Sequence, residues 1–150
     1  DFLDLKKNLI GYDHFEGLKN PNKKDKYFIK SDIGTYTGDK KLIEYIIKFF
    51  KFKKIKIINE DIMNLERKIK NFKKLSFIYI DCDLYVSTRD ALEIIKDKLQ
   101  QGTILLMDDW HQFNAEKSSG QRKAVHEFLE NNQHIHLEDY IIYGHIGKSF

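Results

Sequence analysis

Residues 77–92 read FIYIDCDLYVSTRDAL, and this stretch decides the fold class. Its first four residues are apolar without a break, which is typical of a strand covered on both faces of a parallel sheet. Ser87 opens a Ser-Thr-Arg-Asp segment that resembles a helix N-cap, and apolar residues follow at helical spacing as far as Leu99. The stretch therefore predicts a strand, a turn that carries two aspartates, and a helix.

The same alternation of short strand-like and longer helix-like segments extends along the chain. Strands are expected at Leu9–Tyr12, Ile55–Ile58, Leu75–Ile80 and Thr103–Met107, with one or two closing strands within Ile135–Ile146. Helices are expected at Lys40–Phe50, Ile62–Phe72 and Arg122–Glu130, besides the helix that follows Ser87 and ends at Gly102. This alternation predicts an α/β fold with a mostly parallel central sheet flanked by helices.

The composition limits the classes of protein to which the chain can belong. Its 150 residues, 41% of them apolar, fit one compact domain and exclude a disordered chain. Only three of the 26 basic residues are arginines, so we expect a solvated lysine-rich surface and neither nucleic acid nor a membrane as partner. A single cysteine, Cys82, and the lack of a membrane-spanning apolar run favour a cytoplasmic protein.

Acidic residues follow the expected strands. After the first strand comes Asp13, after the second Glu60 and Asp61, after the third Asp81 and Asp83, and after the fourth Asp108 and Asp109. Ligands of open parallel sheets bind beyond the carboxyl ends of the strands, so these residues are candidates for a binding site. Capping of the next helix explains one carboxylate at such a position, but it does not explain two.

The two central strands should place four carboxylates close together. Asp81 and Asp83 are two residues apart and point to the same side in extended geometry, while Asp108 and Asp109 end the strand expected beside theirs. Carboxylates this close repel one another unless a cation neutralises them, and an all-oxygen set selects Mg²⁺ or Ca²⁺ over zinc. The alternative is a set of solvated helix caps without a metal ion.

Two other enzyme classes carry an Asp-x-Asp motif at the end of a strand. In a phosphatase of the haloacid dehalogenase type the motif ends the first strand, whereas here roughly 75 residues precede it. A nucleotide-sugar glycosyltransferase with a metal-binding Asp-x-Asp gives no role to Asp108 and Asp109. Both classes remain alternatives on these residues alone.

Four segments, in the same order, resemble the macrocin O-methyltransferase family. That family has an apolar strand ending in D-x-D-x-Y-x-S-T and a later one ending in D-D-Y or D-D-W; this chain has IDCDLYVST at residues 80–88 and GTILLMDDW at residues 102–110. Upstream, GYDHFEGL at residues 11–18 is similar to the family's D-S-F-E-G-L turn. Downstream, GQRKAVHEF at residues 120–128 is similar to its G…A-V-x-x-F helix.

The resemblance implies a Rossmann-like class I fold and the transfer of a methyl group from S-adenosylmethionine to a hydroxyl of a sugar or glycosylated small molecule. It also implies a divalent metal ion, usually Mg²⁺. By position, the metal ligands are Asp81, Asp108 and Asp109, and the general base is Asp83. Asp13 falls where such folds bind the ribose of the cofactor, and Glu60 and Asp61 fall near its adenine.

The resemblance also predicts a part of the fold that the chain does not show. The first strand and its glycine-rich loop, which holds the methionine end of the cofactor, should precede Leu9, where only eight residues stand. We therefore expect residues 1–150 to be a single, partial methyltransferase domain of a longer protein, and a homo-oligomer is compatible with it. The alternative is a non-catalytic relative that keeps the fold and lacks the loop.

Overall fold

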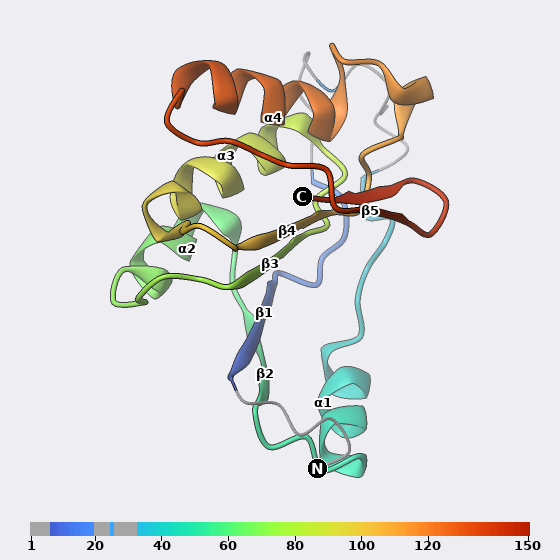
Figure 1. Ribbon diagram of the computed structural model, residues 1–150. Coiled ribbons are helices and arrows are strands. Elements are labelled where there is room, and N and C mark those ends of the chain that lie inside the picture. Colours follow the sequence, from blue (N-terminus) through green and yellow to red (C-terminus); the bar gives the residue numbers. More distant parts are fainter. Residues whose placement is uncertain (1–6, 20–24, 26–32) are drawn as a thin grey trace.

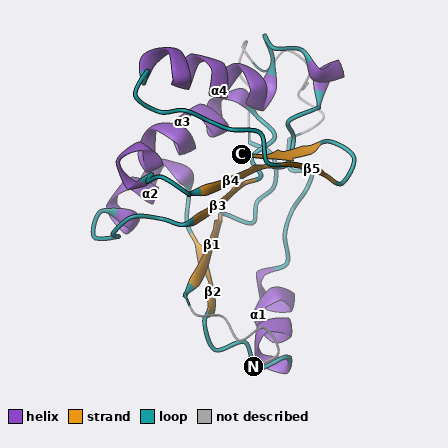
Figure 2. Ribbon diagram, viewed as in Figure 1, coloured by secondary structure: helices purple, strands orange, loops and turns teal. Residues whose placement is uncertain are grey.

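The computed structural model describes residues 7–19, 25 and 33–150, and the described strands form two sheets (Figures 1 and 2). In the smaller sheet β1 (Leu9–Asp13) and β2 (Ile55–Asn59) run parallel. The larger sheet has the order β3–β4–β6–β5 and consists of β3 (Phe77–Ile80), β4 (Ile104–Met107), β5 (Ile141–Tyr143) and β6 (Gly147–Ser149). The predicted α/β class is confirmed.

The helices alternate with the strands along the chain, close to their predicted positions. They are α1 (Lys40–Phe49), α2 (Ile62–Ile69), α3 (Tyr85–Ile95) and α4 (Gly120–Asn131). A 3₁₀ turn, Lys96–Lys98, extends α3, and the chain then turns at Gly102, whose φ of +81° favours glycine. In Figure 1, α3 and α4 lie together on one side of the larger sheet.

The main core lies between this sheet and its helices. Ile80 of β3 and Met107 of β4 are buried, and they share one apolar cluster with Leu92 of α3. The opposite face of β3 is open, since Phe77 and Tyr79 are 47% and 49% exposed. The expectation that both faces of this strand are covered is therefore wrong within the described residues, because the packed helices cover one face only.

The closing strands make the larger sheet mixed rather than mostly parallel. β5 and β6 form a tight hairpin whose turn contains Gly144 at a φ of +59°, and β6 lies between β4 and β5, antiparallel to both. So short a connection can join only antiparallel strands, because a parallel crossover needs a dozen or more residues. The parallel pairs are β1–β2 and β3–β4.

Helix α3 begins two residues before the cap predicted at Ser87. Its N-cap is Leu84, which offers no side-chain acceptor, and the N–H of Tyr85 donates instead to Oδ1 of Asp25 at 2.6 Å. Thr88 lies inside the helix and is fully buried. The prediction was wrong because the acceptor comes from a residue sixty positions away, and local sequence gives no sign of it.

The part of the molecule around β1, β2 and α1 is packed less densely. Helix α1 has no buried residue, although Asp39 caps it by accepting a hydrogen bond from the N–H of Leu42 at 3.0 Å. Among the described strands, β1 pairs only with β2, and β3 pairs only with β4. The additional strand and glycine loop expected upstream stay a prediction. Within the described residues, no helix is long and apolar enough to span a bilayer.

Candidate active site

Three carboxylates meet beyond the ends of β3 and β4. Asp81, Asp108 and Asp109 each place a carboxylate oxygen within 4.8 Å of the other two. They meet because β3 and β4 are parallel neighbours with Ile80 opposite Met107, so the residues that follow them leave the sheet side by side. The structure thus brings together the three residues expected to bind a metal ion.

Asp109 lies deepest in this cluster and is 5% exposed. Its Oδ1 accepts a hydrogen bond from Nε2 of Gln112 at 2.6 Å, and its Oδ2 accepts one from the N–H of Asp83 at 3.0 Å. Burial, followed by the charge of Asp83, raises the pKa of Asp109 to about 7. Its negative charge is therefore costly without a positive partner.

Asp83 lies beside this cluster, in a backbone conformation that is rare for aspartate. Its φ is +51°, in the left-handed region, and its Oδ1 accepts a hydrogen bond from Nε2 of Gln112 at 3.3 Å. Burial raises the pKa of its carboxyl group, and the Gln112 hydrogen bond opposes that rise. Cys82 packs against the core, and burial raises the pKa of its thiol to about 12.

Gln121 of α4 joins the two strand ends from within the protein, and no motif in the sequence singles it out. It is fully buried, its Oε1 accepts a hydrogen bond from the N–H of Asp109 at 3.0 Å, and its Nε2 donates to the carbonyl of Ile80 at 3.1 Å. One amide thus bonds to the last residue of β3 and to the acidic turn after β4. Gln112 was also missed; an amide facing two carboxylates can be recognised only in three dimensions.

Two tyrosines face Asp108. The hydroxyl of Tyr79 in β3 donates to Oδ1 of Asp108 at 2.7 Å, and burial together with this hydrogen bond raises the pKa of Tyr79 above its usual range. Burial, followed by the charge of Asp108, raises the pKa of Tyr143 in β5 to about 12. Both phenols therefore stay protonated at neutral pH beside the carboxylate.

Asp13 ends β1 and belongs to the same edge of the molecule, since its charge contributes to a raised pKa at Asp81. The larger causes of that raised pKa are burial of Asp81 and the charges of Asp108 and Asp83. One oxygen of Asp13, Oδ1, accepts a hydrogen bond from the N–H of Phe15 at 2.6 Å. Among the described residues, no hydrogen bond reaches its other oxygen, Oδ2.

Glu60 and Asp61, expected near the adenine, are engaged by lysines and by α2. Asp61 is the N-cap of α2, where its Oδ1 accepts a hydrogen bond from the N–H of Met63 at 2.9 Å, and its Oδ2 pairs with Lys19. Oε2 of Glu60 lies 3.0 Å from Nζ of Lys68. The hydrogen bonds from lysine lower the pKa of both carboxyl groups, so both are ionised and neutralised by the chain itself.

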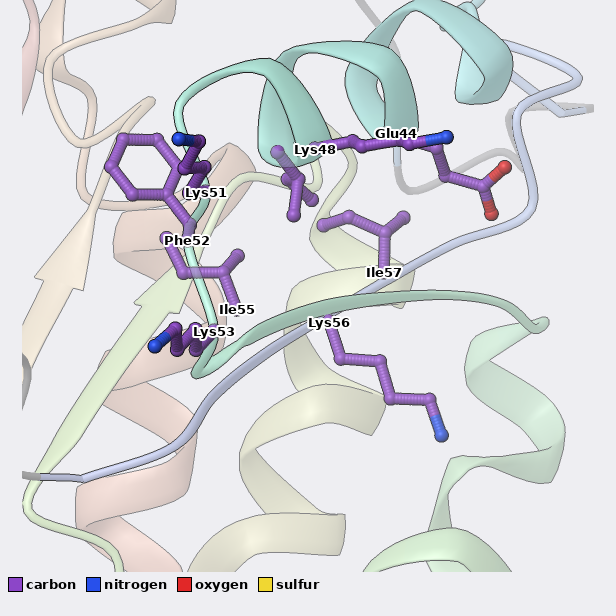
Figure 3. A pocket seen from close by; sticks show the side chains of 9 residues that line it. Glu44, Lys48, Lys51, Phe52, Lys53, Ile55, Lys56 and Ile57 are labelled. Atoms are coloured by element: carbon purple, nitrogen blue, oxygen red, sulfur yellow. The ribbon is translucent and has the colours of Figure 1, made fainter. Parts of the chain in front are cut away.

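A hollow of about 460 Å³ lies elsewhere, between α1 and the beginning of β2 (Figure 3). Glu44, Phe52, isoleucines and four lysines line it, and Figure 3 shows Ile57 between the helix and the strand. The carboxylates described above follow the opposite ends of the strands. This hollow is therefore not the expected cofactor site.

The fold is that of solved methyltransferases. A crystal structure of CalS11, a calicheamicin methyltransferase, matches with a TM-score of 0.72 and 19% identity over 95% of this chain and 59% of that chain. The structure of the O-methyltransferase NovP matches with a TM-score of 0.78 and 16% identity over 99% of this chain and 61% of that one. An apo structure of CalS11, described as a TDP-rhamnose 3'-O-methyltransferase, has a TM-score of 0.64.

The family follows from the sequence. The profile of the macrocin O-methyltransferase family (TylF) matches residues 5–140, and the chain belongs to that family. The resemblance seen in the motifs is thereby confirmed. No curated protein sequence matches the chain significantly. The chain spans about three fifths of the length of the solved structures that it resembles.

Proposed function

We propose that the protein carrying this chain is a cation-dependent O-methyltransferase that uses S-adenosylmethionine to methylate a hydroxyl of a sugar or glycoside. Membership of the macrocin O-methyltransferase family supports this activity. The observation that carries the proposal is the meeting of Asp81, Asp108 and Asp109 within 4.8 Å, next to Asp83. A phosphohydrolase or a glycosyltransferase would leave the family match unexplained.

The three carboxylates fit a hard divalent cation. Their ligand atoms are all oxygen, the donor type that Mg²⁺ prefers. Burial and mutual repulsion raise the pKa of Asp81 and of Asp109, so a positive charge among them would be stabilised. When bound, such a cation would polarise a substrate hydroxyl and lower its pKa.

Asp83 is the group that we assign as the general base. Burial raises its pKa, which makes it a stronger base than an exposed aspartate and brings it nearer to the working pH. The bond from its own N–H to Asp109 and the bond from Gln112 to its carboxylate restrict its orientation. Removal of the hydroxyl proton leaves an oxygen electron pair to bond the methyl carbon as the carbon–sulfur bond of the donor breaks.

We assign the cofactor to the adjoining edge, after β1 and β2. Asp13 has a carboxylate oxygen available for the ribose hydroxyls. Glu60 and Asp61 lie near the adenine in this assignment. A hydrogen bond from either carboxylate to the base would have to displace Lys68 or Lys19, so we expect these residues to contribute mainly to the shape of the site.

Replacement of the base tests the reaction separately from binding. We expect Asp83→Asn to lower the rate of methyl transfer by at least about 100-fold, since a positioned base contributes on that order. The affinity for S-adenosylhomocysteine, measured by calorimetry, should stay within about twofold of that of the wild type, because Asp83 lies at the acidic cluster and not at the cofactor edge. The rate is measured with labelled S-adenosylmethionine, Mg²⁺ and a panel of nucleotide sugars and glycosides.

Asp97→Asn is the matched control, because Asp97 is an exposed aspartate in the turn after α3. It should methylate at the wild-type rate. A wild-type rate in Asp83→Asn contradicts the role as base. If the wild-type protein binds S-adenosylhomocysteine neither with nor without Mg²⁺, the methyltransferase proposal is wrong and the non-catalytic alternative is supported.

A further inference from the structure

Tyr79 stands out on β3 because it places a polar group on the open face of an apolar strand. Its neighbours Ile78 and Ile80 point into the core, while Tyr79 is 49% exposed on the other face. Core packing therefore does not explain a tyrosine here. Its hydroxyl instead reaches past the end of the adjacent strand to Oδ1 of Asp108, at 2.7 Å.

The hydrogen bond engages Oδ1 of Asp108, and a carboxylate oxygen of Asp108 lies within 4.8 Å of those of Asp81 and Asp109. A carboxylate on a turn after a strand can rotate about its side-chain bonds, and repulsion from Asp81 and Asp109 would turn it away from them. The phenol O–H opposes that rotation, because a hydrogen bond to a charged acceptor is stronger than one between neutral groups. Asp108 is thus held in the cluster by a donor that carries no charge of its own.

The phenol that holds Asp108 differs in kind from the donors that hold the neighbouring carboxylate of Asp109. Asp109 is fixed by two side-chain amides, those of the half-buried Gln112 and the buried Gln121. Asp108 is fixed from the open side of the sheet, by the hydroxyl of a ring that is attached to β3. The two carboxylates after β4 are therefore oriented by donors of different kinds, amides for Asp109 and a phenol for Asp108.

We propose that Tyr79 is a positioning residue of the cation site, which fixes the carboxylate of Asp108 so that a divalent cation binds tightly and in one geometry. This inference rests on the proposed cation dependence. Tyr79 acts through Asp108 and is not itself a ligand of the cation. Hydrogen-bond partners of metal ligands change metal affinity by about 10- to 100-fold when they are removed, and one neutral donor should lie at the lower end of that range.

Tyr79→Phe tests the inference with the loss of a single oxygen atom. We expect the affinity for Mn²⁺, measured by calorimetry on the whole protein, to fall about tenfold. The affinity for S-adenosylhomocysteine should be unchanged. The Mn²⁺ concentration that gives half-maximal methyl transfer should rise by the same factor, while the rate at saturating Mn²⁺ recovers to within about twofold. The spin-resonance spectrum of bound Mn²⁺ should also change, because Asp108 becomes free to bind it in more than one orientation.

Tyr45→Phe is the control, because Tyr45 is 62% exposed on α1 and lies in none of these contacts. It should bind Mn²⁺ like the wild type. Equal Mn²⁺ affinity and an unchanged spectrum in Tyr79→Phe overturn the inference and leave the proposed function intact. If the wild-type protein binds no Mn²⁺, both the cation dependence and this inference are wrong. If Tyr79→Phe abolishes the circular dichroism signal, Tyr79 is needed for folding, and this result likewise contradicts the inference.

Discussion

Two groups of carboxylates follow the strands, and they differ in what faces them. After β2, Glu60 and Asp61 are paired with lysines. After β3 and β4, the carboxylates are held by amide, backbone and phenol donors, and no ion pair among the described residues involves them. The difference shows that position at a strand end does not by itself make a carboxylate available to a cation; the charge must also be left unneutralised by the chain.

The strongest test of this contrast is the dependence of stability on pH at Asp109. Its pKa is raised from 3.8 to about 7 in the folded protein, so its contribution to stability is complete below about pH 4 and is lost as the pH rises through 7. Without divalent cations, the free energy of unfolding of the wild type should fall by roughly 2 to 3 kcal/mol between pH 5 and pH 8, relative to that of Asp109→Asn. Urea unfolding at both pH values measures the difference.

The same comparison with Asp97→Asn is the control, because that aspartate is exposed and lies in the turn after α3. A difference for Asp109→Asn that is constant with pH would mean that its charge is compensated in the ion-free protein. The carboxylates after β3 and β4 would then be neutralised by the chain, like those after β2.

A smaller effect is expected at Asp61, where the chain has already neutralised the charge. Asp61→Ala removes the N-cap of α2 and the pairing with Lys19, and should lower the free energy of unfolding by about 1 kcal/mol at neutral pH. Asp39→Ala removes the corresponding cap of α1. It should lower the free energy of unfolding by less, because α1 has no buried residue. Thermal unfolding in low and high salt measures both; only the ion-pair part of the Asp61 effect should decrease with salt.

The smallest effect is expected for Lys68→Met, which removes the partner of Glu60. The pair lies at the surface on the lysine side, so the free energy of unfolding should change less than for Asp61→Ala. Chemical denaturation at neutral pH measures it. A loss larger than that of Asp61→Ala would show that this end of the molecule depends on its ion pairs for folding.

Most of the fold could be predicted because its signals are local. The apolar runs located β1 to β4, and the helical spacing located α1 and α4 to within a few residues. β6 (Gly147–Ser149) lies beyond the range Ile135–Ile146 in which the closing strands were expected, because it has no apolar run. The direction of β5 and β6 could not be predicted, since it depends on a hairpin turn within a weakly patterned segment. Neither could the start of α3, because its cap is supplied by Asp25.

The candidate site also has features that could be predicted from the sequence and features that could not. The meeting of Asp108 and Asp109 with the carboxylate after β3 could be foreseen from the rule that parallel strands end at one edge. The donors that hold them could not, because Gln112 and Gln121 look like ordinary polar residues of a loop and a helix. Their meaning depends on contacts between segments that are distant in the sequence.

The left-handed backbone at Asp83, with a φ of +51°, has a consequence for any saturation library at that codon. Asparagine and glycine tolerate this conformation, whereas valine or isoleucine would add a backbone cost of about 1 to 2 kcal/mol to the loss of the carboxylate. Inactive clones that still accumulate in the cell should therefore be enriched in asparagine and glycine. The β-branched clones should be depleted by misfolding before their chemistry is ever assayed.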